Sequence, residues 1–581
     1  MSQLMLGNEA IARGLYEAGC TVVSSYPGTP STEITESVAK YDEVYAEWAP
    51  NEKVAMEVAI GASIAGARSF CAQKHVGLNV AADPLFTVSY TGVSGGLVIA
   101  VADDPGMHSS QNEQDSRYYA IAAKLPMLEP SNSAECRDYI KLAYELSEEM
   151  DTPVIIRLST RVSHSQSLLE LNERDNVALK PYEKNIQKYV TLPANSRSLH
   201  IKVEQRQLTL AKWAETSAIN KVEMGDTKIG VITAGICYQY AKDVLGNNAS
   251  YLNLGMVNPL PTELIKDFAS KVDKLYIIEE LDPIIESHCR QLGIECIGKD
   301  GEIFTLLGEY SQNLVARKIL TQTADFTRFP ESVPVRPPVM CSGCPHRGLF
   351  YVLNKLKVTV SGDIGCYTLG AVAPLSAMDT TICMGASVSG LHGFNKARGE
   401  SAEHSTVAVI GDSTFMHSGM TGLVNIAYNK SNSTVIILDN SITGMTGHQQ
   451  NPTTGYNLKG DAAAAVNLEE LCKAIGIRRV RVVDPHDLKA TEDVIREELA
   501  VNEPSVIITR RPCALLKYVK HNPPLKVNRD KCRSCKACMR LGCPAISMVD
   551  TKAQIDATQC VGCGLCEQLC KFGAIGGCDN E

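Results

Sequence analysis

Short runs of apolar, mostly β-branched residues recur along the chain and alternate with helix-length amphipathic stretches. Seven of these runs predict buried strands, at residues 97–103, 153–159, 228–234, 274–279, 406–410, 434–439 and 505–509. Strands that alternate with helices form parallel sheets, and the helices cover the faces of those sheets. The pattern therefore predicts a multidomain α/β protein.

Three breaks in this pattern predict four domains. A polar, weakly periodic stretch lies near 172–199, a proline-rich loop at 331–340 and a second proline-containing segment at 521–528. Proline stiffens linkers and stops helices, and 581 residues are too many for one core. We predict domains over residues 1–185, 200–325, 335–518 and 523–581, the last a small α+β domain.

Composition narrows the classes of function. The net charge is −9, from 56 Lys and Arg against 65 Asp and Glu, which argues against a nucleic-acid partner because such binders are usually basic. No apolar run reaches the roughly 18 residues that a membrane helix needs. The first residues lack the pattern of a signal peptide. A cytoplasmic protein without a membrane partner is the expectation.

Eight of the 21 cysteines lie in the C-terminal tail in two runs with two-residue spacing. The runs are Cys532, Cys535, Cys538 and Cys543, then Cys560, Cys563, Cys566 and Cys570. This spacing predicts two [4Fe–4S] clusters and an electron carrier. A zinc-binding tail is the alternative, but zinc sites use four cysteines in two pairs. Cys578 is left over and receives no role.

The fourth cysteine of each run in two-cluster ferredoxins ligates the other cluster. On that rule Cys570 joins the first three cysteines of the tail, and Cys543 joins the second triplet. The first run has one extra residue before Cys543, and Lys571 replaces the proline that usually closes the second run. The crossed pairing is therefore an inference from the rule.

Polar residues end two predicted strands of the third domain. Gly411, Asp412 and Ser413 follow the strand at 406–410, and Asn440 follows the strand at 434–439, with 27 residues between Asp412 and Asn440. Carboxylate and amide oxygens at the carboxyl ends of parallel strands suit Mg²⁺, and a diphosphate supplies further ligands. The alternative is a pair of ordinary polar turns.

This spacing resembles the thiamine diphosphate motif GDG-x(about 26)-N, with Ser413 in place of the last glycine. The block is similar to the diphosphate-binding domain of the thiamine diphosphate-dependent 2-oxoacid:ferredoxin oxidoreductase family. The resemblance implies that Asp412, Asn440 and the backbone carbonyl of Ile442 hold Mg²⁺. It also implies that the loop containing Gly444 and Thr446 lies by the diphosphate.

The N-terminal block resembles the pyrimidine-binding domain of the same family, through YPGTPS at 26–31 and NEKVAMEVAIGAS at 51–63. With CPHRG at 344–348 and GCYTLG at 365–370, the order of motifs is similar to the large (α) subunits of its indolepyruvate branch. The second domain then resembles the C-terminal domain of transketolase. The echo between GASIAG (61–66) and GASVSG (385–390), each expected to open a helix, is explained by two thiamine domains of one ancestral fold.

The resemblance also implies roles for side chains of the first domain. Glu52 matches the carboxylate that hydrogen-bonds the aminopyrimidine and activates the cofactor, with Glu57 as the second candidate. Thr29 matches the position that hydrogen-bonds the substrate. The alternative role for Thr29 is that its hydroxyl only caps a turn or a helix. His75 and His108 are further candidates, His108 because the loop 103–117 is expected to line the substrate entrance. A solvated loop histidine is the alternative for His108.

Four more cysteines match places where the related pyruvate enzymes hold a cluster next to thiamine. They are Cys341, Cys344, Cys366 and Cys513. A third [4Fe–4S] cluster here would relay electrons to the tail. A zinc half-site or free thiols are the alternatives.

The resemblance implies oxidative decarboxylation of aryl 2-oxoacids, such as indolepyruvate and phenylpyruvates, with CoA as cosubstrate and ferredoxin as electron acceptor. It also implies a separate small β subunit in an α₂β₂ heteromer. Two alternatives remain: a non-redox thiamine-dependent decarboxylase, and an electron-transfer subunit whose thiamine site is inactive. The cysteine tail counts against the first, and intact Glu52, Asp412 and Asn440 count against the second.

Overall fold

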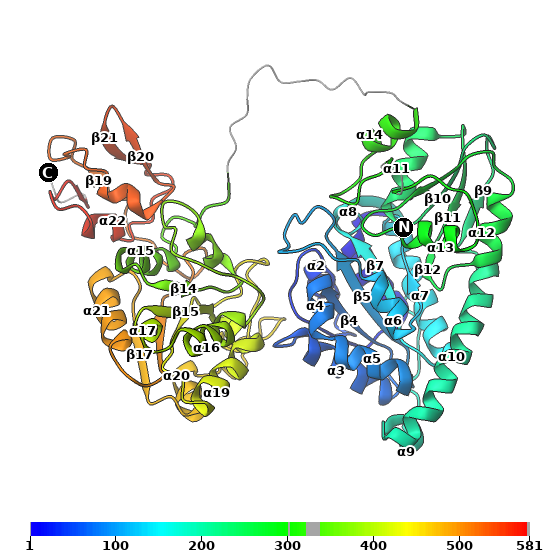
Figure 1. The fold of residues 1–581 in the computed structure, drawn as a ribbon, viewed down its shortest axis with the longest axis horizontal. Helices are drawn as coiled ribbons and strands as arrows, with labels where there is room; N and C mark the ends of the chain where they lie inside the picture. Colours follow the sequence, from blue (N-terminus) through cyan, green and yellow to red (C-terminus); the bar gives the residue numbers. More distant parts are fainter. Residues whose placement is uncertain (1, 300–302, 321–336, 578–581) are drawn as a thin grey trace. The chain divides into compact units, whose positions relative to one another are not determined.

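A computed structural model describes residues 2–299, 303–320 and 337–577 (Figure 1). The chain divides into two compact units, 1–330 and 331–581. The predicted domain boundary at 325–335, most of the proline-rich loop and Cys578 lie outside the described residues. The other predicted boundaries within each unit stay predictions.

The first unit is built on a seven-stranded sheet. Its order is β12 (Met256–Asn258), β6 (Met127–Leu128), β7 (Val154–Ser159), β5 (Leu97–Asp103), β4 (Ser69–Lys74), β2 (Val22–Ser25) and β3 (Tyr45–Trp48). All pairs are parallel except β12 with β6. Every residue of β5 and β7 is buried, because helices cover both faces of a parallel sheet.

Helices alternate with these strands along the chain. They are α1 (Gly7–Glu17), α2 (Thr32–Val38), α3 (Glu52–Ile64), α4 (His75–Val80), α5 (Ala82–Thr91), α6 (Arg117–Ala123) and α7 (Ser133–Met150). Asn51 caps α3 by accepting a hydrogen bond from the Val54 amide, so the helix begins at Glu52. GASIAG therefore lies at the end of α3 and does not open a helix as expected, whereas Gly385 of GASVSG does precede α16 (Ala386–Arg398).

A second sheet of the same unit has the order β13 (Leu275–Ile278), β10 (Gly230–Thr233), β11 (Ser250–Asn253) and β9 (Lys221–Glu223), with β9 antiparallel. Its helices include α11 (Ile236–Leu245), α12 (Thr262–Ala269) and α13 (Ile284–Gln291), and α10 (Pro193–Thr216) precedes it. One hydrophobic core contains residues of both sheets, including Ile99 of β5 and Ile277 of β13. This shared core joins the two sheets in one unit.

The second unit contains a fully parallel five-stranded sheet. Its order is β14 (Thr359–Ser361), β15 (Thr406–Gly411), β16 (Thr434–Asp439), β18 (Ser505–Arg510) and β17 (Arg479–Val483). The helices around it are α15 (His346–Leu356), α16, α19 (Met420–Tyr428), α20 (Leu468–Ile475) and α21 (Leu488–Leu499). All seven strands predicted from the sequence are confirmed within two residues at each end.

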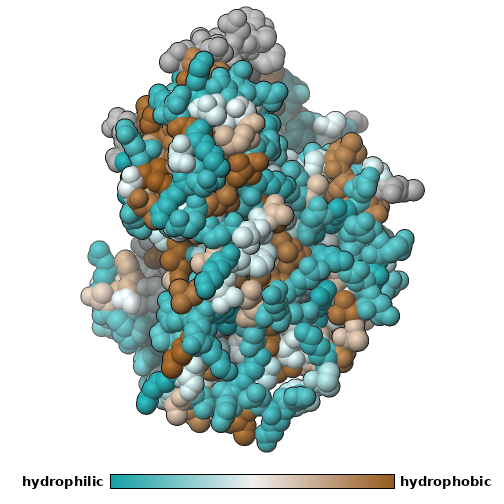
Figure 2. All heavy atoms as spheres, turned by 90° about the vertical axis from the view of Figure 1, so that its right-hand side faces the viewer, coloured by the Kyte–Doolittle hydropathy of each residue, from teal (hydrophilic) through white to brown (hydrophobic). Residues whose placement is uncertain are grey.

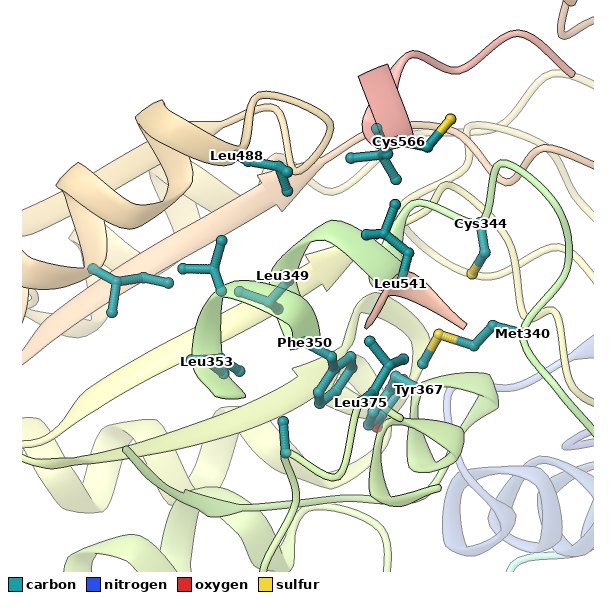
Figure 3. Packing of buried hydrophobic residues seen from close by; sticks show 14 of the residues in the cluster. Met340, Cys344, Leu349, Phe350, Leu353, Tyr367, Leu375, Leu488, Leu541 and Cys566 are labelled. Carbon is teal, nitrogen blue, oxygen red and sulfur yellow. The ribbon is translucent and has the colours of Figure 1, made fainter. Parts of the chain in front are cut away.

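The C-terminal part of this unit is small and rich in turns. Two antiparallel pairs, β19 (Lys526–Val527) with β22 (Ile575–Gly576) and β20 (Ile546–Val549) with β21 (Lys552–Ile555), accompany the short helix α22 (Leu565–Gln568). Its apolar side chains continue the core of the preceding domain: Leu541 and Cys566 lie above Leu349 and Phe350 of α15 (Figure 3). This packing fixes the cysteine tail against the five-stranded domain.

One face of the surface can be followed in Figure 2. On the face that Figure 2 turns to the viewer, hydrophilic groups predominate and hydrophobic ones are scattered among them. Among the described residues, no helix combines the length and apolar character needed to cross a membrane.

Candidate thiamine and iron–sulfur sites

Asp412 and Asn440 lie at the carboxyl ends of two neighbouring parallel strands. β15 ends at Gly411 and β16 at Asp439, and Gly411 is in register with Leu438. Both side chains are buried. Parallel strands bring their carboxyl ends to one edge of a sheet, which is where ligands bind in such folds.

Three polar groups converge at this edge. One terminal atom of the Asn440 amide lies 3.3 Å from Asp412 Oδ1 and 2.8 Å from the carbonyl oxygen of Ile442. The other terminal atom lies 3.5 Å from Nε2 of His346. Without a cation, the amide nitrogen would face the two oxygens and donate to both. With Mg²⁺ bound, the amide oxygen would take that place, because Mg²⁺ prefers oxygen ligands.

The electrostatics of Asp412 fit a cation. Burial raises the pKa of the Asp412 carboxyl to about 7, and the negative charge of Asp439 adds to the rise. The backbone amide of Ser413 donates to Asp412 Oδ1 at 2.8 Å, but no basic side chain pairs with this carboxyl among the described residues. A divalent ion would supply the missing positive charge. The predicted Mg²⁺ ligands therefore fit the ion.

The loop after β16 is ordered by its own polar contacts. Thr443 donates to the hydroxyl of Ser413 at 2.9 Å, so the residue that departs from the glycine motif takes part in holding the loop. Thr446 donates to Gln449. A side chain at Gly444 would place its Cβ 3.5 Å from the sulfur of Cys366, which brings this loop beside one of the predicted cluster cysteines.

Glu52 is a buried carboxylate in the first unit. It is the first residue of α3 and is 5% exposed, so it is not a solvent-exposed carboxylate of the kind often found at a helix start. A Cβ at Gly77 would lie 2.6 Å from Glu52 Oε1, so α4 approaches the carboxylate through a residue without a side chain. Glu57, the second candidate, is half exposed and pairs with Lys53.

A buried lysine, Lys74, is linked to Thr29 through Ser109 and was not predicted as a site residue. Lys74 ends β4, is 7% exposed, and donates from Nζ to the carbonyl of Ser109 at 2.6 Å. The hydroxyl of Ser109 donates to the Thr29 carbonyl at 3.3 Å. A Cβ at Gly28 would lie 3.2 Å from Cβ of Lys74. The loop at 103–117 therefore contacts the Thr29 backbone through Ser109, and its expected place at the substrate entrance stays a prediction.

Lys74 places a side-chain amine in a buried environment, where its positive charge could bind an anion. Burial lowers its pKa to about 8, and the negative charge of Asp104 opposes that fall. A lysine at the end of an otherwise uncharged strand was the signal in the sequence, since lysine is seldom buried without a partner or a function.

The two candidate histidines have different surroundings. His75 opens α4, is buried, and lies 3.3 Å through Nε2 from the carbonyl of Asn112; burial lowers its pKa. His108 is half exposed and pairs through Nε2 with Glu309 at 3.0 Å, beside Arg161. The structure thus brings His75 to the loop near Thr29, while it holds His108 in a surface ion pair. His346, given no role above, is buried beside Asn440.

The four cysteines predicted for a third cluster lie near one another and near the loop after β16. We call Cys341, Cys344, Cys366 and Cys513 the third set. The amide of Cys513 donates to the carbonyl of Asn440 at 2.9 Å, and that of Cys344 to the carbonyl of Cys341 at 3.2 Å. Burial raises the pKa of Cys366 to about 11, with the charges of Cys513 and Cys341 adding to it.

The tail cysteines form two groups. Cys532, Cys535, Cys538 and Cys570, the first set, line one cavity together with Arg533, Lys536, Met548 and Phe572. The second set consists of Cys543, Cys560, Cys563 and Cys566. Burial raises the pKa of Cys566, and the charges of the three other cysteines add to the rise. Among the described residues, no group of three His, Cys, Asp or Glu side chains is close enough to hold a single metal ion. This does not count against iron–sulfur clusters, because the thiolates of one cluster bind different iron atoms and stand farther apart.

The second set is the one that faces the five-stranded domain. A Cβ at Gly343 would lie 2.3 Å from a methyl carbon of Val561, between Cys560 and Cys563. Arg347, at the start of α15, donates to the carbonyls of Leu541 and Cys341. The residues that line the cavity of the first set all belong to the tail. The second set thus approaches the segment that carries Cys341 and Cys344, whereas no lining residue of the first-set cavity comes from the five-stranded domain.

Comparison with known proteins gives three family matches. The family described as "Pyruvate flavodoxin/ferredoxin oxidoreductase, thiamine diP-bdg" matches residues 13–220. The C-terminal TPP-binding domain of thiamine pyrophosphate enzymes matches residues 363–509, which include Asp412 and Asn440. The 4Fe–4S binding domain matches residues 553–576.

Curated relatives extend over nearly the whole chain. Indolepyruvate oxidoreductase subunit IorA of Archaeoglobus fulgidus is 40% identical over 98% of this chain and 97% of its own length. The chain belongs to the IorA family. The IorA proteins of Pyrococcus horikoshii, at 40% identity, and Methanothermobacter marburgensis, at 38%, each match 98% of this chain and 96% of their own lengths. The IorA-family chain is thus a subunit of a 2-oxoacid:ferredoxin oxidoreductase, with thiamine-binding and 4Fe–4S domains. The predicted family and fold class are confirmed.

Proposed function

We propose that this chain, with a separate small β subunit, oxidatively decarboxylates aryl 2-oxoacids, using CoA to form the aryl-acyl-CoA and passing electrons to ferredoxin. The observation that carries the proposal is the convergence of Asp412, Asn440 and the Ile442 carbonyl in the same compact unit as the two tail cysteine sets. Indolepyruvate is the expected substrate because the relatives bear its name.

Different residues of the chain would hold the metal and the cofactor. Asp412, Asn440 and the Ile442 carbonyl would hold Mg²⁺, which binds the diphosphate. Glu52 would hold a proton at the aminopyrimidine ring nitrogen. When bound, thiamine diphosphate supplies the nucleophilic carbon and the electron sink for loss of CO₂.

The substrate carries a carboxylate that must be held before it leaves. The Lys74 ammonium, linked to Thr29 through Ser109, supplies a buried positive charge of the kind that binds a carboxylate strongly. Thr29 would add a hydroxyl from the segment between β2 and α2. His75 is a candidate proton donor, supported by its burial beside Asn112. His108 stands at the surface with Glu309 and receives no catalytic role in this proposal.

Electrons leave through the cysteine sets. We assign [4Fe–4S] clusters to the first and second sets, with the crossed pairing, and a third cluster to the set beside Asn440. The contacts of Cys513 with Asn440 and of Gly343 with Val561 support this arrangement. The final acceptor is ferredoxin. The word "subunit" in the names of the relatives supports a partner chain, and we propose an α₂β₂ assembly.

The test is an anaerobic assay of the chain co-purified with its β subunit. The reaction contains indolepyruvate, CoA and methyl viologen as electron acceptor, and mass spectrometry identifies the products. We expect viologen reduction that requires CoA, with indoleacetyl-CoA and CO₂ as products. A panel of phenylpyruvates, branched-chain 2-oxoacids, pyruvate and 2-oxoglutarate then ranks kcat/KM.

Other outcomes would assign other functions. Aldehyde without viologen reduction would identify a non-redox decarboxylase. Absence of turnover together with absence of bound thiamine would identify an electron-transfer subunit with an inactive thiamine site. A higher kcat/KM for pyruvate or 2-oxoglutarate than for every aryl substrate would overturn the proposed substrate class.

A further inference from the structure

The cavity of the first cysteine set opens at a basic surface on an acidic protein. Across residues 526–540 there are six Lys and Arg and one Asp, whereas the whole chain has a net charge of −9. Cys535 is exposed, although the three other cysteines of this set are buried or half-buried. Arg533, Lys536 and Phe572 line the same cavity, and Phe572 is 49% exposed.

The positive charges at this surface are available to a partner. Lys531, Arg533 and Lys536 are exposed. No carboxylate of the described residues forms an ion pair with any of the three, whereas Arg529 nearby pairs with Asp550 at 3.6 Å. Elsewhere in the same unit, exposed cations are commonly paired, as Lys489 is with Asp493. Local ion pairing therefore does not account for the three charges.

The position of the cavity suits this surface to electron transfer. Its lining belongs to the tail alone, whereas the second set approaches Gly343 of the five-stranded domain through Val561. Electron transfer between proteins requires a close approach of the donor group to the acceptor, and such encounters are small and steered by charge. An exposed ligand cysteine with an exposed aromatic ring beside it provides the point of closest approach.

We propose that Lys531, Arg533 and Lys536, around Cys535 and Phe572, form the docking face for an acidic iron–sulfur carrier protein. The proposal rests on the function proposed above and names the surface through which its electrons leave. The basic groups attract carboxylates of the carrier and orient its cluster toward Cys535. One electron leaves the reduced cluster of the first set and reduces one cluster of the carrier, with no bond formed or broken.

The test separates docking from thiamine chemistry. The holoenzyme is reduced with dithionite, desalted anaerobically and mixed in a stopped-flow instrument with an oxidised two-[4Fe–4S] ferredoxin of negative net charge. We compare wild type, the face variant Lys531→Glu/Arg533→Glu/Lys536→Glu, and the control Lys396→Glu/Lys430→Glu/Lys489→Glu. The control residues are exposed positions of the five-stranded domain, and the change in net charge is equal.

We expect the second-order rate constant to fall about tenfold or more in the face variant, and much less in the control, because electrostatic steering accelerates association by factors of this order. Added salt should slow wild type and have little effect on the face variant. Equal rates in the face and control variants would overturn the proposal. So would a loss that is fully explained by a shift in the midpoint potential of the first-set cluster, measured in an EPR-monitored redox titration.

The two proposals fail in different ways. If dithionite-reduced enzyme transfers electrons with this charge dependence but no 2-oxoacid reduces the enzyme, the docking face stands and the proposed function falls. Iron content and substrate-dependent viologen reduction, which should stay within about twofold of wild type, verify that the face variant keeps its clusters.

Discussion

The side-chain amide of Asn440 lies 3.3 Å from the carboxylate of Asp412, although 27 residues separate the two in sequence. The contact exists because β15 and β16 are parallel neighbours that end together. With the Ile442 carbonyl 2.8 Å from the same amide atom, three polar groups surround one point. A cation at that point would turn the amide so that its oxygen joins the other two oxygens as a ligand, and we therefore expect the arrangement of the three groups to depend on the metal.

Substitution of Asp412 tests this dependence. Asp412→Ala removes the charged ligand, so we expect the purified variant to retain less than about a tenth of the thiamine diphosphate of wild type, because metal and cofactor bind together. Asp461→Ala, at an exposed position in the same domain, is the control. Thiamine is measured by fluorescence after oxidation to thiochrome. Unchanged thiamine content in Asp412→Ala would refute the metal assignment.

The pH dependence of Mg²⁺ binding follows from the same carboxyl. In the metal-free protein the pKa of Asp412 is about 7, and Mg²⁺ binds only the ionised form. Protonation therefore competes with the metal below pH 7. We expect Mg²⁺ affinity, measured by isothermal titration calorimetry with thiamine diphosphate present, to be about tenfold weaker at pH 6 than at pH 8. Proton release on binding should be visible near pH 7. An affinity that is flat across this range would contradict the prediction.

The sequence predicted seven of the strands, because buried parallel strands are continuous apolar runs. It also predicted that Asp412 and Asn440 follow the ends of two of them. It did not predict Lys74, since the contact with Ser109 joins the end of β4 to a loop 35 residues away. His108 was a candidate on the strength of its loop alone, but its partner Glu309 lies 201 residues away. The first contact depends on the pairing of β4 with β5, and the second on how residues far apart in the first unit pack together. No local sequence pattern records either.

Glu52 should be essential for turnover and dispensable for folding. Glu52→Gln keeps the shape of the side chain but removes the carboxylate, so we expect kcat to fall about 10²- to 10⁴-fold, the usual range for loss of an acid–base group. Bound thiamine should remain. Glu57→Gln is the matched control, since Glu57 lies on the same helix, half exposed and paired with Lys53. If Glu57→Gln lost the activity and Glu52→Gln kept it, the assignment would move to Glu57.

Lys74 should control substrate affinity. In Lys74→Met a side chain of similar length loses its charge, and we expect KM for indolepyruvate to rise about 10- to 100-fold, the worth of a charge-assisted hydrogen bond. In wild type the ammonium is the binding form, so kcat/KM should fall as pH rises through about 8, the pKa of Lys74. The variant should lack that limb of the pH profile. Lys53→Met, at an exposed position, serves as the control, and unchanged KM in Lys74→Met would exclude the role.

The third cysteine set predicts an iron count. Three [4Fe–4S] clusters require about 12 iron atoms per chain, and two require about 8. Cys366 lies beside the loop at Gly444, so Cys366→Ser should lower the count by about four and slow substrate-dependent viologen reduction, because the thiamine site would lose its nearest electron acceptor. Cys383→Ser, an exposed cysteine of the same domain, should change neither value. Anaerobically purified wild type with about 8 iron atoms per chain, unchanged by Cys366→Ser, would show that the third set holds no cluster and that electrons reach the second set directly.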